Sequence, residues 1–283
     1  MPTQGKICVI TGATSGIGLA SAEVLAATGA RLVLVGRDRQ KGEAVLARIK
    51  TVQAACEASV LYADLSRLDA VRALAAELAA LPRIDVLVNN AGAVFNRRAL
   101  TEDGLERTFA LNHMNYYLLT RLLLPRLAAS APARVVVVAS GAHRRARLDF
   151  DDLQMAHGFS GRIAYSRSKL CNILFTRELA RRIAGTGVTA NCLHPGFVAT
   201  RFGDNTDGLF RVALSLGKRL LALTPAQGAE TLIYLATSPD IASVSGLYFG
   251  KCHVQTPSAA AQDDGAALRL WDASARIAGL PAA

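Results

Sequence analysis

The stretch KICVITGATSGIG, residues 6–18, joins a short β-branched run to a glycine-rich turn and to the start of a helical pattern. Glycine lets the backbone turn tightly and lets a ligand come close to the main chain. A helix that begins at such a turn presents unpaired N–H groups to an anion. The spacing G-x-x-x-G-x-G is weak alone, but its place between strand and helix favours pyrophosphate binding over a ligand-free turn. The expected contacts are Gly12, Thr14, Ser15, Gly16, Ile17 and Gly18.

Apolar strand patterns and helical patterns alternate along the rest of the chain. Continuous apolar strands between helices indicate a parallel sheet covered on both faces. We therefore expect an α/β fold, a Rossmann-type doubly wound parallel sheet in a single domain over residues 1–283, with a dinucleotide at the carboxyl ends of the strands. The predicted strands are 6–11, 31–36, 59–62, 84–88, 134–139, 188–193 and 247–249. The predicted helices are 16–28, 39–50, 68–81, 105–128 with a bend at Pro125, 162–184 and 225–237.

The composition is that of a globular chain with ample apolar material, since 51% of the 283 residues are hydrophobic. No apolar run approaches the roughly 18 residues of a spanning helix. The N-terminus runs directly into a strand pattern without the features of a secretion signal, so we expect a cytoplasmic protein without a membrane span. The five cysteines are scattered and the histidines show no ligand spacing, which favours reduced core thiols and no metal site.

The formal net charge is +10, and one local basic cluster contains Arg144, Arg145 and Arg147. This charge indicates either attraction to a polyanion or arginines spread over the surface. The chain has no zinc-finger, helix-turn-helix or interleaved aromatic pattern, so we expect no nucleic-acid partner. We expect the cluster to face solvent rather than a substrate entrance.

The end of the second predicted strand bears on the choice of dinucleotide. An acidic residue there binds a free adenosine ribose, whereas a basic residue suits a 2′-phosphate. Gly36 stands where the acid is expected, and Arg37 follows with a planar fork of donors. We therefore expect NADP(H) in preference to NAD(H). Asp38 could instead form an ion pair with Arg37 or Arg39, or begin the next helix as its N-cap.

Polar residues also follow the third and fourth predicted strands. Asp64, before Leu65, could bond the adenine amino group or cap the next helix, and we favour the cofactor contact. Asn89 and Asn90 could tie adjacent strand ends together and border the adenosine ribose. From this region the expected cofactor contacts are Asp64, Leu65, Asn90, Ala91 and Gly92.

Tyr165 and Lys169 are four residues apart in a segment with a helical pattern, which puts both side chains on one helix face. An ammonium beside a phenol favours the phenolate, so we expect Lys169 to lower the pKa of Tyr165 from about 10. A tyrosine tuned in this way exchanges a proton with an alcohol or carbonyl oxygen near neutral pH. Alone, Tyr-x-x-x-Lys usually marks two solvated residues, so its weight comes from the motifs upstream.

Together these motifs resemble the short-chain dehydrogenase/reductase family over nearly the whole chain. The glycine motif, residues 89–92, Ser140, the Tyr165–Lys169 pair and Pro195-Gly196 occur in the order typical of the family. Other segments resemble its retinol dehydrogenase-like branch. These are LNH at 111–113, GAH at 141–143, HPGFVAT at 194–200 and YFGKC at 248–252.

The resemblance implies a catalytic role for four side chains. Tyr165 would be the acid/base, and Ser140 would donate a hydrogen bond to the substrate oxygen. Lys169 would lower the pKa of Tyr165 and bind the nicotinamide ribose. Asn112 would kink its helix and hold a water that leads to Lys169. Further cofactor contacts are implied for Tyr165, Lys169, Pro195, Gly196, Val198 and Thr200.

We therefore expect an enzyme, an NADP(H)-dependent oxidoreductase that interconverts a lipophilic carbonyl compound and its alcohol. Two donors aimed at a carbonyl oxygen stabilise the alkoxide that forms on hydride addition. Segment 197–224 is expected to form a substrate lid, and residues 251–283 a C-terminal tail. The alternative is a non-catalytic NADP(H)-binding regulatory protein of the same fold. Helices 105–128 and 162–184 could pair with a second subunit in a homodimer or homotetramer, or could cover the sheet.

Overall fold

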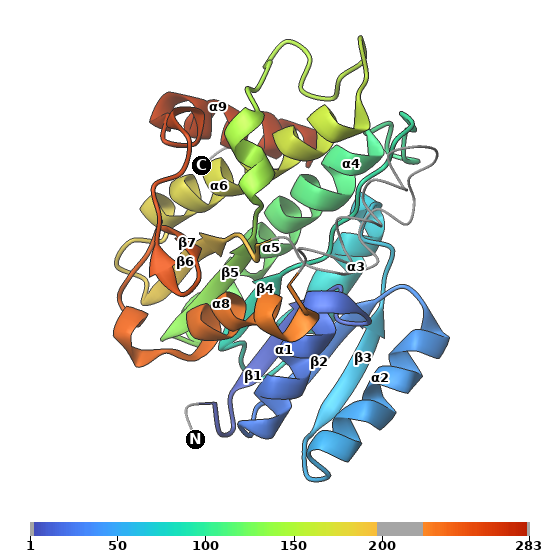
Figure 1. Ribbon diagram of the computed structural model, residues 1–283, viewed down its shortest axis with the longest axis vertical. Coiled ribbons are helices and arrows are strands. Elements are labelled where there is room, and N and C mark those ends of the chain that lie inside the picture. Colours follow the sequence, from blue (N-terminus) through green and yellow to red (C-terminus); the bar gives the residue numbers. More distant parts are fainter. Residues whose placement is uncertain (1–2, 197–222, 282–283) are drawn as a thin grey trace.

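The computed structural model describes residues 3–196 and 223–281, which contain an eight-stranded sheet (Figure 1). The strand order is β3-β2-β1-β4-β5-β6-β7-β8. Neighbouring strands from β3 to β7 are parallel, and β8 pairs antiparallel with β7. The strands are β1 Ile7–Thr11, β2 Arg31–Gly36, β3 Ala58–Tyr62, β4 Val86–Asn89, β5 Ala133–Val138, β6 Val188–Leu193, β7 Tyr248–Gly250 and β8 His253–Val254.

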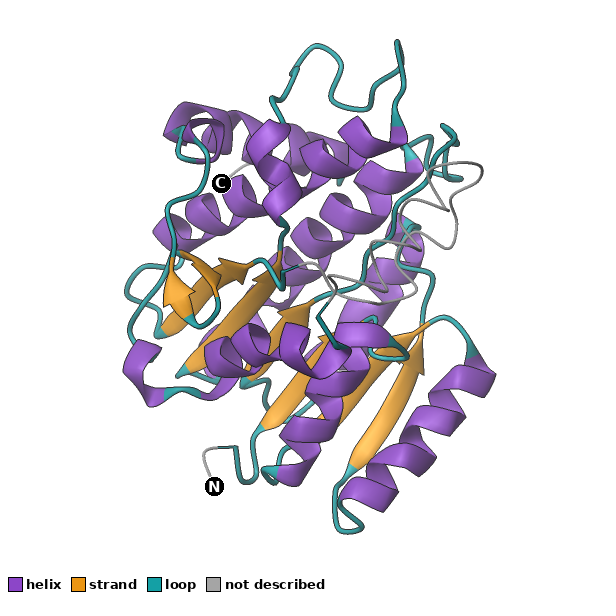
Figure 2. Cartoon of the chain, viewed as in Figure 1, coloured by secondary structure: helices purple, strands orange, loops and turns teal. Residues whose placement is uncertain are grey.

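Helices cover both faces of this sheet (Figure 2). The α-helices are α1 Gly16–Ala27, α2 Arg39–Val52, α3 Leu68–Ala79, α4 Arg107–Phe109, α5 Asn115–Ala129, α6 Gly161–Arg182, α8 Pro225–Thr237 and α9 Asp264–Ile277. Shorter turns are the π-helical η1 Ala110–Met114 and the 3-10 turns η2 Gly141–Arg145, η3 Pro239–Ile241 and η4 Ala259–Ala261. The predicted doubly wound sheet with helices on both faces is confirmed.

Alternation along the strands divides the apolar residues between two cores, because successive side chains point to opposite faces. Cys8 and Ile10 of β1 pack in one core with residues of α1, α2 and α8. Ile7 and Val9 pack in the other with residues of α3, α5 and α6. The carboxyl ends of β1 and β4 lie between these layers, where the strand order reverses direction, and this is the place where doubly wound sheets bind ligands.

The C-terminal helix α9 was not predicted, and it packs on α6. The Trp271 ring stacks on Phe175 of α6 at 6.0 Å between centroids and meets Tyr117 of α5 edge-on at 5.1 Å. Within the same contact, Ser274 Oγ lies 2.9 Å from Nε2 of the buried His113. Apolar residues of α5 and α6 thus pack against the sheet and against the tail of the same chain.

The predicted helix 105–128 is interrupted in the structure. A short α4 leads into the π-helical turn η1, and regular α-helix resumes at Asn115. Asn112 lies inside η1, where its buried side chain bonds the backbone of Ala93. Pro125 lies within α5. Among residues 3–196 and 223–281, no helix has both the length and the apolar character needed to cross a membrane.

Candidate active site

The glycine turn after β1 is shaped by the absence of side chains. Gly12 and Gly16 have φ angles of 66° and 57°, a region that L side chains rarely adopt. A Cβ on Gly12 would lie 2.7 Å from the Cα of Ala91, and a Cβ on Gly18 would lie 2.7 Å from Nδ2 of Asn90. Ser15, the exposed N-cap of α1, makes no capping hydrogen bond with its side chain. The first N–H groups of α1 and this hydroxyl can therefore serve an anionic ligand.

Side-chain hydrogen bonds join the ends of β1 and β4 beneath this turn. The buried Thr11 hydroxyl donates to Val88 O at 3.1 Å and accepts from the backbone N–H groups of Asn90 and Ala91 at 2.9 and 3.1 Å. Asn90 Nδ2 donates to Thr11 O at 2.9 Å. Asn89 instead points away, to Thr120 of α5, so only one of the two predicted amides ties the strand ends.

The end of β2 carries a basic residue without an acidic partner among the described residues. Arg37 is exposed, and no ion pair to it occurs in the described part of the chain. Asp38 is the N-cap of α2, accepts from Lys41 N at 3.1 Å and pairs with Lys41 Nζ at 3.0 Å. These bonds hold the pKa of Asp38 below its usual value. A Cβ on Gly36 would meet Thr14 Cγ2 at 2.5 Å, so an acidic side chain at this position would require Thr14 to move.

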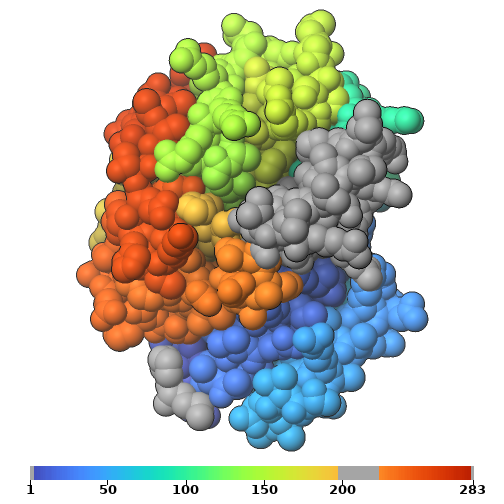
Figure 3. All heavy atoms as spheres, in the orientation of Figure 1, coloured from blue at the N-terminus to red at the C-terminus, as the bar shows by residue number. Residues whose placement is uncertain are grey.

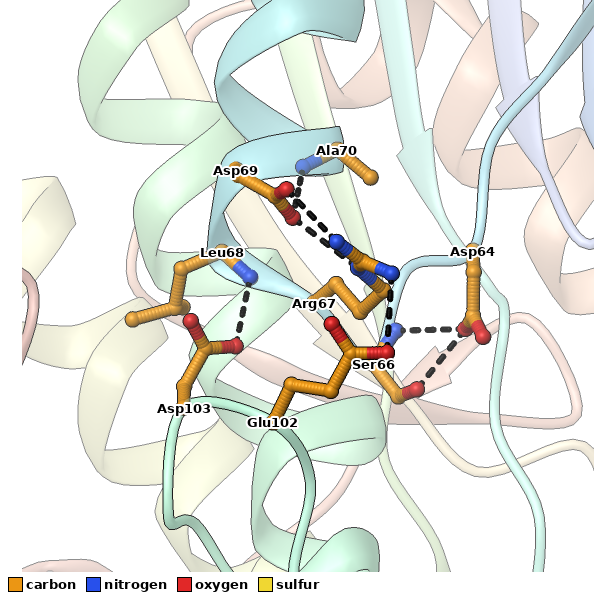
Figure 4. A network of polar contacts seen from close by, with 8 residues as sticks. All are labelled: Asp64, Ser66, Arg67, Leu68, Asp69, Ala70, Glu102 and Asp103. Carbon is orange, nitrogen blue, oxygen red and sulfur yellow. Dashed lines mark hydrogen bonds and ion pairs between the residues drawn. The ribbon is translucent and has the colours of Figure 1, made fainter.

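Asp64 does not cap α3 (Figure 4). Its Oδ1 accepts from the backbone N and from Oγ of Ser66, at 3.0 and 2.7 Å. The first N–H of α3, on Leu68, bonds Asp103 instead, and the neighbouring Arg67 bridges Asp69 and Glu102. Asp64 stays exposed after β3, where a ligand can reach it. Leu65 is buried in the core, so any cofactor contact there falls to its backbone.

The side chains of Ser140, Tyr165 and Lys169 meet beyond the end of β5. A hydrogen bond joins the Ser140 and Tyr165 side chains. Lys169, buried one helical turn later, donates to Val138 O at 2.9 Å, and its Nζ lies 5.8 Å from the Tyr165 ring centre. A Cβ on Gly92 would lie 3.6 Å from that Nζ, which brings the β4 end to the same place. The end of β4 and the predicted residues Ser140, Tyr165 and Lys169 therefore lie close together in the structure.

The pKa shifts of this pair differ in direction from the prediction for Tyr165. Burial raises the pKa of the Tyr165 phenol to about 12, and the hydrogen bond with Ser140 acts in the opposite direction. Burial lowers the pKa of the Lys169 ammonium to about 7. Desolvation disfavours the charged form of each group, and in this structure that cost outweighs the attraction expected between phenolate and ammonium.

Asn112 is connected to Tyr165 through a residue that sequence reasoning missed. Asn112 Nδ2 donates to Ser168 Oγ at 3.0 Å, and Ser168 Oγ donates to Tyr165 O at 2.7 Å. Its Oδ1 accepts from Ala93 N at 2.9 Å. The Asn112 amide therefore fixes the segment after β4 and the turn of α6 that carries Tyr165. The only sequence feature that could have indicated this connection is the serine directly before Lys169.

The segment after β6 is described only as far as Gly196. Pro195 and Gly196 follow the strand at its carboxyl end, and Gly196 has a φ of 81°. Val198, Thr200 and nearly all of the predicted lid, residues 197–222, lie outside the described residues. The arginines at 144, 145 and 147 are exposed, and Arg144 donates to Thr256 O at 2.8 Å.

Comparison with known proteins places this arrangement in one family. A model described as short chain dehydrogenase matches residues 6–207. Retinol dehydrogenase 14 of Mus musculus is 43% identical, covering 98% of this chain and 87% of that protein. A crystal structure from Mycobacterium paratuberculosis is 33% identical, with a TM-score of 0.79, and covers 99% of this chain and 96% of that chain. A metagenomic short-chain oxidoreductase in complex with NADP is 28% identical, with a TM-score of 0.65, covering 88% and 97%.

Proposed function

The chain belongs to the short-chain dehydrogenase family, and we propose that it is an NADP(H)-dependent enzyme that interconverts a lipophilic carbonyl compound and its alcohol. Retinol dehydrogenases are among its relatives, which favours a long apolar aldehyde, ketone or alcohol of the retinoid type as substrate. The whole chain would form one such domain. The observation that carries the proposal is the hydrogen bond between Ser140 and Tyr165 at the carboxyl edge of the sheet, with Lys169 one helical turn away.

The residues around the glycine turn fit a dinucleotide. Gly12 approaches Ala91 so closely that a side chain does not fit there, and a ligand can therefore approach the backbone. The N-terminus of α1 supplies hydrogen-bond donors for a pyrophosphate. Arg37 supplies a planar fork for a 2′-phosphate, while Asp38 is engaged by Lys41 and is less available to ribose hydroxyls. These contacts support NADP(H) over NAD(H). When bound, the nicotinamide supplies or accepts the hydride.

In carbonyl reduction, Tyr165 would donate its proton to the oxygen of the substrate as negative charge develops there. A pKa near 12 keeps the phenol protonated at neutral pH, which is the form this direction requires. Ser140 would donate a second hydrogen bond to the same oxygen and stabilise the alkoxide. In alcohol oxidation the roles reverse, and the phenolate would take the proton. Lys169 would stabilise that phenolate once charge forms.

The test is a panel of apolar aldehydes, ketones and alcohols, assayed by the absorbance of NADPH and NADH in parallel. Tyr165→Phe is expected to lower kcat by about 10²–10⁴-fold with NADPH affinity preserved, because only the proton donor is removed. Tyr234→Phe on α8 is the matched control, since that ring packs on Phe249 in one core, whereas the residues of α6 pack in the core on the other face of the sheet. NADPH binding without turnover of any substrate would instead favour a regulatory protein.

A further inference from the structure

A buried histidine connects Ser140 to the C-terminal tail. His143, which has 0% exposed surface, places Nδ1 2.7 Å from Ser140 O. On the opposite side of the ring, the backbone N–H of Ser258 donates to Nε2 at 3.2 Å. Because a backbone N–H can only donate, Nε2 carries no proton, and the proton lies on Nδ1 where it bonds Ser140 O. His143 is therefore neutral, with both nitrogens used.

A second histidine has the opposite arrangement, at the other side of the site. The N–H of Gly196 donates to His194 Nδ1 at 3.3 Å, so the proton lies on Nε2, 3.0 Å from Gln255 Oε1. The backbone of Gln255 is itself held in place, because its backbone N–H donates to Tyr248 O at 2.8 Å. His194 thus connects the tail to the backbone of the Pro195-Gly196 segment through hydrogen bonds.

The two histidines flank one aromatic ring. Tyr248 of β7 lies 5.1 Å from the His143 ring, edge to face, and 5.4 Å from the His194 ring. Two tail residues contact these histidines, Gln255 at His194 and Ser258 at His143. In Figure 3 the chain around residue 145, in bright green, borders the orange-red C-terminal part, which agrees with the bond from Arg144 to Thr256 O.

We propose that tail residues 255–258 position both halves of the reaction site, Ser140 through His143 and Gly196 through His194. Both histidines are positioning residues, since each acts on the site through a backbone group. The inference rests on the proposed function in giving Ser140 and Gly196 their roles. Fixing the carbonyl of Ser140 at one end of its turn fixes the direction of the Ser140 hydroxyl toward Tyr165, and small displacements of such a donor are costly in rate.

A matched pair of variants isolates the bond from the tail to His143. Ser258 has a φ of −64°, which proline adopts, so Ser258→Pro removes the N–H donor without forcing a new backbone angle. Ser258→Ala keeps that N–H and removes only a buried hydroxyl that has no hydrogen-bond partner in the described structure. We expect Ser258→Pro to lower kcat at least about tenfold with little change in NADPH affinity, while Ser258→Ala stays near wild type.

The pH profile separates positioning from simple destabilisation. Burial first, then Arg144 and His194, lower the pKa of His143, whereas the bond to Ser140 raises it, and the Tyr248 ring packs against it. Without the Ser258 N–H, Nε2 becomes free to take a proton, so the pKa of His143 rises above its wild-type value. Ser258→Pro should therefore gain an acid limb in kcat that Ser258→Ala lacks. Identical profiles in the two variants would overturn the proposal.

The contact between Gln255 and His194 is tested through the KM for NADPH. Gln255→Leu removes the acceptor of His194 and is expected to raise the KM for NADPH several-fold with a smaller change in kcat. Gln53→Leu, at the end of α2, is the control, because its side chain forms no hydrogen bond in the part of the chain that the structure describes. A change in kcat alone, or equal effects of both variants, would contradict a role for His194 in positioning the cofactor segment.

Histidine NMR of the wild-type protein tests the geometry without any assay. We expect His143 in the Nδ1–H form and His194 in the Nε2–H form, two opposite tautomers in one protein. Finding the same tautomer for both would overturn the inference even if the enzyme is active. If the tautomers agree but no substrate turns over, the proposed function fails while the contacts of the tail stand.

Discussion

The glycine turn after β1 excludes side chains, whereas the site around Tyr165 is assembled from them. At Gly12 a single added carbon would lie 2.7 Å from Cα of Ala91, so the proposed cofactor region depends on the absence of side chains there. Around Tyr165 the structure depends on a connected set of polar groups, from Asn112 through Ser168 to the tyrosine backbone. The first region should therefore fail when atoms are added, and the second when atoms are removed.

The difference has an electrostatic reason. A dinucleotide brings its own charge and finds its partners in exposed backbone N–H groups, which stay solvated until it binds. The proposed catalytic groups are buried. Burial moves the pKa of Lys169 down to about 7 and, against the opposing effect of Ser140, that of Tyr165 up to about 12. Buried polar groups need every partner they have, because an unsatisfied one is costly.

The largest effect is expected in the region built from side chains. Ser140→Ala should lower kcat by about 10²–10³-fold, as loss of one donor to a developing oxyanion does. The bond with Ser140 lowers the pKa of Tyr165, so its loss should raise that pKa further. Because alcohol oxidation needs the phenolate, its pH–rate profile should move to higher pH. A profile that moves to lower pH would contradict this assignment.

The second-largest effect is expected when one carbon is added to the glycine turn. Gly12→Ala should weaken NADPH binding and lower the free energy of unfolding by about 1–3 kcal/mol, since the backbone there has a φ of 66° and meets Ala91. Gly141→Ala is the control for stability, because a Cβ there has nothing within 4 Å. Urea unfolding and a cofactor titration measure the two effects. Unchanged cofactor affinity would show that the turn is not the pyrophosphate site.

Thr11 differs from the glycines beside it, because it is a side chain on which the proposed cofactor region depends. Thr11→Val keeps the shape but leaves the N–H groups of Asn90 and Ala91 without their acceptor. We expect a loss of about 1–3 kcal/mol in the free energy of unfolding. Thr51→Val, at an exposed site on α2, should change it little. Equal effects of the two would mean that water replaces the lost acceptor.

The smallest effect is expected at Arg37, which is exposed. Arg37→Ser should raise the KM for NADPH about tenfold, in line with the loss of one charge-assisted contact. The KM for NADH should stay the same, because NADH lacks the 2′-phosphate. Rising salt should weaken NADPH binding in the wild type more than in the variant. A parallel rise for both cofactors would place Arg37 away from the phosphate.

Several features were predictable because they are local. The glycine spacing, the strand–helix alternation and the four-residue step from Tyr165 to Lys169 follow from backbone geometry within a few residues. The helix α9 was predictable but missed. Its Asp263 accepts from Ala266 N as the N-cap, and Ala267, Leu270, Trp271 and Ser274 are buried at helical spacing.

Other features could not be obtained from local patterns. The π-helical turn at Asn112 accompanies bonds to Ala93, a residue on another segment. The cap of α3 comes from Asp103, which is 35 residues away in the sequence. The expected lowering of the Tyr165 pKa considered only the neighbouring charge, while the burial that outweighs it is created by the whole fold.

By itself, the sequence determined the doubly wound sheet, the position of the glycine turn and the identity of the polar groups at the strand ends. Only the tertiary structure decided which of these groups are buried, which proton each histidine carries and which distant residue completes each hydrogen bond. The reason is that backbone periodicity acts over a few residues. Desolvation and hydrogen-bond partners depend on surfaces that folding brings together from distant parts of the chain, such as the turn of Ser140 and the N–H of Ser258.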